Sequence, residues 1–221
     1  MPRPTQAFID LSALAHNLGV VRQYVHCSRI MAVVKADAYG HGLLHTASAL
    51  KDVDGFALLE LDAAISLRDA GYQQPILLLE GFFSTEELAL FEQYRLSAVI
   101  HHSEQIAMLS DSKHHNLDLF LKINTGMNRL GLAPEQFPQI MKALTDHPGI
   151  DSITLMTHFA SADDPLEEDE VFQQLQYFEA ITQNHKYPHS LANSAAIIRY
   201  PVTHADWVRP GIMLYGASPF A

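Results

Sequence analysis

A lysine that directly follows a short apolar run is the first residue of this sequence whose position suggests chemistry. The run Ile30–Val34 contains β-branched residues and is too short for a helix, so it is predicted to be a buried strand that ends at Lys35. Burial lowers the pKa of an ammonium group and makes the amine a nucleophile or a base, as in lysines that form Schiff bases. The alternative is a structural lysine whose stem covers the strand end while its ammonium group reaches water.

Alternation along a later apolar run predicts a second inward lysine. In residues 117–124 the leucines and an isoleucine occupy every other position, which leaves Lys122 and Asn124 on the opposite face. His158 and Arg209 end two further runs with the same parity. If the carboxyl ends of these strands meet, the residues form a locally basic site, which suits an anionic, phosphorylated ligand.

Each of these residues also has a structural explanation when taken alone. A histidine at a strand end is often a hydrogen-bonded core residue, and a strand-end lysine often reaches water along its stem. Asn193 and Ser194 resemble an ordinary helix cap, and Arg209 followed by Pro210 and Gly211 resembles a turn. Their joint placement at successive strand ends favours a site.

The elements that must position these residues are eight short apolar runs that alternate with helical patterns. The runs are Ile30–Lys35, Gly55–Leu59, Pro75–Glu80, Ser97–His101, Leu117–Asn124, Asp151–His158, His189–Asn193 and Ala205–Arg209. This alternation predicts an α/β fold, a parallel (β/α)₈ TIM barrel, as one domain over residues 1–221 with its site at the carboxyl ends of the strands. An open doubly wound sheet is the structural rival, but no GxGxxG follows a strand. Before the first run, Thr5–Leu11 is predicted to be a strand and Ser12 to cap a helix that reaches about Val25.

Composition restricts the possible partners. The chain has 221 residues and a formal net charge of −11, so a nucleic-acid partner is not expected. A single cysteine, Cys27, suits a reducing cytoplasm, and the sequence offers no secretory signal and no apolar stretch long enough to span a membrane. The 13 histidines are scattered without metal-ligand spacing, so no metal site is predicted.

Five segments, in order along the chain, resemble the bacterial alanine racemases, which are pyridoxal 5′-phosphate (PLP) enzymes of fold type III. The segments are VVKADAYGHG at 33–42, LLLEGFF at 77–83, LKINTGMNRLG at 121–131, THFASAD at 157–163 and DWVRPGIMLYG at 206–216. ANSAA at 192–196 is a weaker match. The resemblance implies an isomerase that interconverts L- and D-alanine for peptidoglycan supply.

Carried over by position, the resemblance also implies roles for individual residues. Lys35 corresponds to the lysine that forms the Schiff base with PLP, and Arg129 to a residue near the cofactor phenolate and the substrate carboxylate. Arg209 corresponds to the arginine at the pyridine nitrogen, backed by His158, and Lys122 to a lysine that is carbamylated in some members. The phosphate would be held by Tyr39, Ser194 and the backbone at Gly211 and Ile212, and Asn193 would be a further cofactor-binding residue.

The family also implies parts that lie outside this sequence. In full-length relatives a C-terminal β-domain follows the barrel, pairs with the N-terminal strand, here residues 1–11, and supplies the tyrosine that serves the opposite face of the substrate in a homodimer. A barrel without that domain is expected to bind PLP and to racemise alanine weakly. Glu60 stands where relatives usually carry Arg or another non-acid, and an acid there would weaken anion binding if it pointed inward.

Two other functions stay open at this point. Single-barrel PLP carriers have about this length and no β-domain, but their motifs differ from TGMNRLG and VRPGIMLYG. A barrel enzyme that acts on a sugar phosphate and uses Lys35 without PLP is the third possibility.

Overall fold

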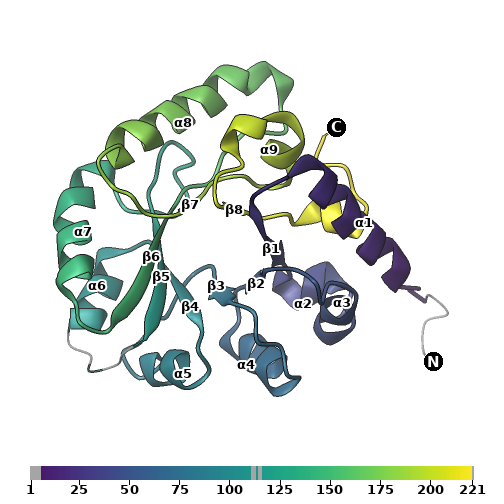
Figure 1. Cartoon of the computed structure of the whole chain (residues 1–221), viewed down its shortest axis with the longest axis horizontal. Coiled ribbons are helices and arrows are strands. Elements are labelled where there is room, and N and C mark those ends of the chain that lie inside the picture. Colours follow the sequence, from purple (N-terminus) through teal and green to yellow (C-terminus); the bar gives the residue numbers. More distant parts are fainter. Residues whose placement is uncertain (1–5, 111–112, 114–115, 221) are drawn as a thin grey trace.

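Eight parallel strands close into a barrel in the order of the sequence, from β1 to β8, as the alternation predicted (Figure 1). The structure is a computed structural model, and it describes residues 6–110, 113 and 116–220. The strands are β1 Arg29–Val33, β2 Gly55–Leu58, β3 Ile76–Leu78, β4 Ser97–Ile100, β5 Leu117–Lys122, β6 Ile150–Met156, β7 His189–Ser190 and β8 Trp207–Val208. Each lies within, or overlaps, one of the eight predicted runs.

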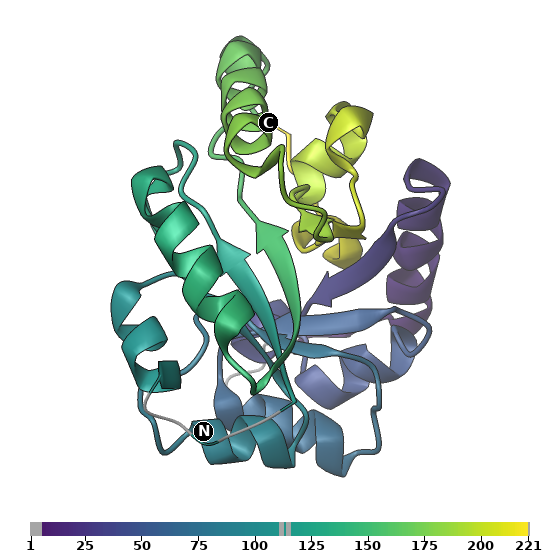
Figure 2. The same ribbon diagram turned by 60° about the vertical axis from the view of Figure 1, so that its left-hand side comes forward.

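Helices surround the barrel and cover the outer faces of its strands (Figure 2). They are α1 Leu11–Tyr24, α2 Lys35–Gly40, α3 Leu43–Ala49, α4 Leu61–Asp69, α5 Leu88–Gln93, α6 Ser103–Ser110, α7 Phe137–Asp146, α8 Glu168–Thr182 and α9 Ser194–Arg199. Short 3₁₀ turns form η1 Pro134–Gln136, η2 Pro165–Glu167, η3 Pro201–Thr203 and η4 Ile212–Tyr215. Among the described residues, no helix has the length and apolar character needed to cross a membrane.

The period of two along each strand separates an inner from an outer core, as predicted. Outward-facing side chains such as Ile30, Leu119 and Leu155 pack under the helices in one large cluster. A second cluster fills the lumen, and its members are Met31, Val33, Ala57, Leu77, Val99, Phe120, Met156 and Trp207. We call this second cluster the lumen plug. It separates the cavity at the carboxyl ends of the strands from a cavity of about 530 Å³ at their amino ends.

The N-terminal segment differs from the prediction. Residues 6–10 form no strand, Phe8 is 90% exposed, and Leu11 is already the first residue of α1; Thr5 lies outside the described residues. The N-cap is Asp10, whose carboxylate accepts hydrogen bonds from the N–H groups of Ser12 and Ala13. The helix forms because this cap is local, whereas a strand needs a partner. That residues 1–11 pair within a further domain stays a prediction.

The loop after β5 corrects a second expectation. Asn124, predicted to face the lumen, folds back instead, and its side-chain oxygen accepts hydrogen bonds from the N–H groups of Gly126 and Asn128. Gly131 closes this loop with a φ of +131°, and a Cβ atom at that position would lie 2.7 Å from the Asn124 nitrogen. The loop therefore depends on a glycine where its two ends meet.

We expect Gly131→Ala to lower the free energy of unfolding by about 2 kcal/mol or more, because an added methyl group meets backbone atoms that cannot rotate away. Gly19→Ala is the matched control. Gly19 lies in α1 with no atom within 4 Å of an added Cβ, so this change should stabilise the chain by roughly 0.5–1 kcal/mol. Urea unfolding measures both, and equal effects of the two substitutions would contradict the described loop.

Candidate active site

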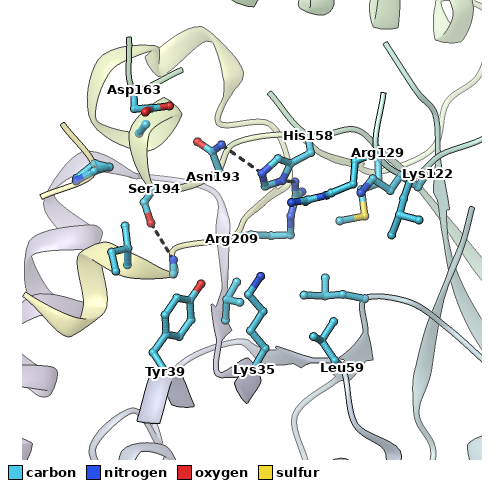
Figure 3. Close-up of a pocket in the computed structure, with 18 of the residues that line it drawn as sticks. Lys35, Tyr39, Leu59, Lys122, Arg129, His158, Asp163, Asn193, Ser194 and Arg209 are labelled. Carbon is cyan, nitrogen blue, oxygen red and sulfur yellow. Dashed lines mark hydrogen bonds between the residues drawn. The ribbon is translucent and has the colours of Figure 1, made fainter. Parts of the chain in front are cut away.

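A cavity of about 660 Å³ opens at the carboxyl ends of the strands (Figure 3). Every residue that the sequence predicted for the site lies on its wall, and these residues are Lys35, Tyr39, Lys122, Arg129, His158, Asn193, Ser194, Arg209, Gly211 and Ile212. Apolar side chains directly after β2 and β3 and at the end of β6, namely Leu59, Leu79 and Met156, also line the wall. The fold thus brings together residues that are up to 177 positions apart in the sequence.

Lys35 and Tyr39 reach the cavity from an unusual turn. Residues 36–39 all have left-handed backbone angles, with φ between 50° and 55°, although none of them is glycine. A left-handed turn costs L-residues roughly 1–2 kcal/mol each, so the surrounding structure must hold this one in place. The turn places the Lys35 amine and the Tyr39 hydroxyl side by side, both pointing into the cavity (Figure 3).

Contacts at both ends secure this left-handed turn. The Asp37 carboxylate accepts a hydrogen bond of 2.7 Å from the Leu43 N–H at the start of α3, and the Ala38 N–H donates to the Val34 carbonyl at 3.0 Å. The sequence gave no sign of the left-handed turn, because alanine and tyrosine rarely adopt such angles.

Arg209 lies at the centre of the cavity wall and is 4% exposed. Its guanidinium group donates hydrogen bonds to the Ser190 hydroxyl at 2.6 Å and to the carbonyls of Thr157 and Leu191 at 2.7 and 3.0 Å. No carboxylate forms an ion pair with it among the described residues. Burial lowers the pKa of Arg209 to about 9, so it remains a cation at neutral pH and its field is felt by its neighbours.

The pKa of Lys122 shows this field. Lys122 is 6% exposed, and burial followed by the charges of Arg209, Arg129 and Lys35 lowers its pKa to about 8. With this pKa, about one tenth of the molecules carry a neutral Lys122 amine at pH 7. The neutral amine is the nucleophilic form.

His158 is held neutral by the same surroundings. Burial and then the charge of Arg209 lower the pKa of its imidazole well below 6.5. Its Nδ1 lies 3.5 Å from Nη2 of Arg209, and its Nε2 lies 3.5 Å from Nδ2 of Asn193, so an N–H donor faces each ring nitrogen. Asn193 is itself fixed as the cap of α9, because its Oδ1 accepts from the Ala196 N–H. Donors on both sides disfavour a protonated ring.

Four residues form an anion cradle on the opposite wall, which we define as Tyr39, Ser194, Gly211 and Ile212. The Ser194 hydroxyl accepts a hydrogen bond of 2.9 Å from the Gly211 N–H, which leaves its own proton free to donate into the cavity. A Cβ atom at Gly211 would lie 2.7 Å from the Tyr39 hydroxyl, so only glycine allows this close approach. The hydroxyl groups of Tyr39 and Ser194, in a cavity that also contains buried cations, fit a phosphate group.

The acidic residues at the cavity are Glu80 and Asp163, which the sequence did not single out. Glu80 lies just beyond β3 and raises the pKa of Lys122 only as the last of five causes. Glu60, the acid that the sequence did single out, is exposed at the N-cap of α4 and lies outside the cavity wall. Period-two counting beyond a short strand would have favoured Leu59 over Glu60 as the inward residue, since Ala57 faces the lumen.

Comparison with known proteins places this geometry in a family. Residues 9–219 match the family model described as the N-terminal domain of alanine racemase. Curated relatives include an alanine racemase of Nitrosospira multiformis, 59% identical over 100% of this chain and 62% of the relative. Another, from Nitrosomonas europaea, is 62% identical over 99% of the chain and 61% of the relative. The chain therefore spans less than two thirds of the length of these relatives.

Solved structures give the same result. The biosynthetic alanine racemase from Pseudomonas aeruginosa superposes with a TM-score of 0.92 and 41% identity, covering 96% of this chain and 60% of that one. The alanine racemase from Acinetobacter baumannii has a TM-score of 0.89 and 39% identity, covering 96% of this chain and 63% of that one.

The left-handed turn predicts an unusual response to glycine. Ala36→Gly should raise the free energy of unfolding by up to about 1 kcal/mol, because glycine adopts the left-handed angles without steric cost. Ala15→Gly, at an exposed position in the right-handed helix α1, should lower it by about 1 kcal/mol. Denaturant unfolding distinguishes the two, and equal losses would mean that residue 36 is not left-handed in solution.

The lowered pKa of Lys122 predicts that the free energy of unfolding changes with pH. Its folded pKa lies below that of the unfolded chain, so the folded state gains stability as pH rises from about 8 towards 10.5. Lys122→Met should therefore stabilise the chain by roughly 1–3 kcal/mol near pH 7, and most of this difference should be lost near pH 10. Lys51→Met, at an exposed lysine, is the control and should change stability by less than about 0.5 kcal/mol at either pH. A Lys122→Met variant no more stable than the original chain near pH 7 would refute the cost of this buried charge.

Proposed function

We propose that this chain, which belongs to the alanine racemase family and matches its N-terminal domain, is the PLP-binding barrel of an enzyme that interconverts L- and D-alanine. The observation that carries the proposal is the placement of Lys35, whose amine points into the cavity across from the buried Arg209 guanidinium and beside the anion cradle. A lysine for the Schiff base, an arginine to face the pyridine nitrogen and a site for the phosphate are features that suit PLP.

The residues present fit this cofactor. The Tyr39 and Ser194 hydroxyls and the backbone at Gly211 and Ile212 would hold its phosphate, supported by the close approach of Tyr39 to Gly211. When bound, PLP links to a lysine amine and withdraws electrons from a substrate amine, which makes the substrate Cα–H acidic. This chemistry matches a reaction that removes and returns a proton at Cα.

Individual residues then have distinct roles. Lys35 would hold and return the proton at the substrate Cα on one face. Arg209 would donate a hydrogen bond to the pyridine nitrogen, and because a guanidinium group does not take up a further proton, that nitrogen would stay unprotonated. His158, neutral and in contact with Arg209, would keep the guanidinium group oriented.

The roles of Arg129 and Lys122 complete the proposed site. Arg129, exposed at the rim of the cavity, would bind the carboxylate of an amino acid. Lys122 is a candidate for carbamylation, because its pKa of about 8 leaves a neutral amine that can add CO₂ and release a proton. The product is an anion, which would attract Arg129 and relieve the crowding of positive charges.

For the chain as described, we propose weak racemisation. The relatives act as longer proteins, of which this chain covers about 62%, and a second base on the opposite face of the substrate is part of the family mechanism. We also propose a homodimeric, cytoplasmic full-length protein that supplies D-alanine for peptidoglycan. A PLP carrier without catalytic activity is the competing function.

The test is to add PLP, record the visible spectrum, reduce with borohydride and map the modified peptide by mass spectrometry. We expect a lysine-bound cofactor at Lys35, and its loss in Lys35→Ala but not in Lys51→Ala. Modification spread over several exposed lysines would contradict the proposal.

Proton exchange separates the enzyme from the carrier. With PLP bound, alanine in heavy water should exchange its α-hydrogen, and one enantiomer, by resemblance D-alanine, should exchange faster, because a single base reaches a single face of Cα. Nuclear magnetic resonance follows both enantiomers, with Lys35→Ala as the inactive control. Cofactor binding without any exchange would favour the carrier, and equal exchange of both enantiomers would contradict a single base at Lys35.

A further inference from the structure

Tyr215 connects the anion cradle to the strained turn that carries Lys35 and Tyr39. It is the last residue of η4, the 3₁₀ turn that begins at Ile212 within the cradle, and it does not line the cavity itself. Its ring packs on the ring of Tyr39, with centroids 4.7 Å apart, and on the ring of His41, with centroids 4.8 Å apart. One side chain from the end of the chain therefore contacts two residues near its beginning.

A hydrogen bond fixes the Tyr215 ring in place. Its hydroxyl donates to the Val33 carbonyl at 3.0 Å, on the strand that leads into Lys35. Burial raises the pKa of this hydroxyl, so it stays protonated and remains a donor. The segment that carries Tyr215 is anchored from its other side, where the Asn17 amide donates to the Leu214 carbonyl at 2.9 Å. The Tyr215 hydroxyl is thus attached to β1, and the backbone next to Tyr215 is attached to α1.

Tyr39 depends on this support. Its backbone is left-handed, with φ of 55°, and its hydroxyl reaches Gly211 at a distance that leaves no room for a Cβ atom. No hydrogen bond holds the Tyr39 hydroxyl among the described residues, so packing fixes its direction. Tyr39 packs against the lumen plug on the barrel side and against the Tyr215 ring, with centroids 4.7 Å apart. A side chain held by packing shifts when one of its neighbours shrinks.

We propose that Tyr215 is a positioning residue that holds the Tyr39 hydroxyl at the anion cradle and thereby sets the affinity for the phosphate of PLP. The inference rests on the proposed function. It adds a residue that touches neither cofactor nor substrate and acts through Tyr39. It also predicts an effect on the phosphate end of the ligand alone.

The experiment compares PLP with pyridoxal, which has the same aldehyde and ring but no phosphate. Dissociation constants for both are measured from the absorbance of the lysine-bound form, in the unmodified chain and in Tyr215→Leu and Tyr215→Phe. We expect Tyr215→Leu to weaken PLP about tenfold and pyridoxal less than twofold, because only PLP uses the Tyr39 hydroxyl. Tyr215→Phe keeps the ring against Tyr39. The ratio of its two dissociation constants should stay within about threefold of the ratio in the unmodified chain.

A double substitution tests whether the effect passes through Tyr39. Tyr39→Phe should lower the preference for PLP over pyridoxal, and Tyr215→Leu added to it should lower that preference no further. A merely structural role of Tyr215 would weaken both aldehydes equally and would add to the effect of Tyr39→Phe. If Tyr215→Leu does not fold, as judged by circular dichroism, Tyr215→Met replaces it in both comparisons.

The outcomes separate this inference from the proposed function. If the unmodified chain binds neither aldehyde at Lys35, the proposed function fails and the role of Tyr215 fails with it. If both aldehydes bind and Tyr215→Leu leaves their ratio unchanged, only the role of Tyr215 is overturned. The role of Tyr215 is supported if Tyr215→Leu lowers the preference for PLP over pyridoxal, Tyr215→Phe keeps that preference, and Tyr215→Leu has no further effect on it in the Tyr39→Phe background.

Discussion

The buried guanidinium group of Arg209 determines the electrostatics of the whole cavity. It is held by a hydroxyl and two carbonyl oxygens rather than by a carboxylate, so its charge is positioned without being neutralised. These oxygens and Arg209 itself lie in or directly after three consecutive strands, β6, β7 and β8, so the position of the charge depends on the closed barrel. The lowered pKa of Lys122 and that of His158 both follow in part from this charge. An acidic protein thus contains a small volume in which positive charge prevails.

The left-handed turn is the second constraint, and it concerns geometry rather than charge. The left-handed turn after β1 points the side chains of Lys35 and Tyr39 into the same cavity. The cost of these angles is met by contacts from distant parts of the chain, among them the ring of Tyr215. Strain of this kind is typical of sites whose function needs an unusual orientation.

Much of the architecture could be predicted from the sequence because it follows from simple periodicity. The eight strands, the inner and outer faces of β1, β5 and β6, and the gathering of Lys35, Lys122, His158 and Arg209 all come from a period of two in short apolar runs. The failures occurred where the deciding contact lies far away in the sequence or is specific to one side chain. The Asn124 side chain forms hydrogen bonds within its own loop, and Asp10 rather than Ser12 caps α1. No local sequence pattern predicts the four left-handed residues 36–39. Roles such as that of Arg129 came from resemblance and not from periodicity.

The lumen plug has a consequence for how molecules reach Lys35. Buried side chains such as Met31, Phe120 and Trp207 fill the barrel below the site, so the cavity is closed at its inner end. Whatever enters must leave by the way it came, so an incoming molecule and an outgoing one compete for the same passage. The time that an anion stays in such a cavity depends on the charges near its opening, and the exposed guanidinium group of Arg129 is one of them.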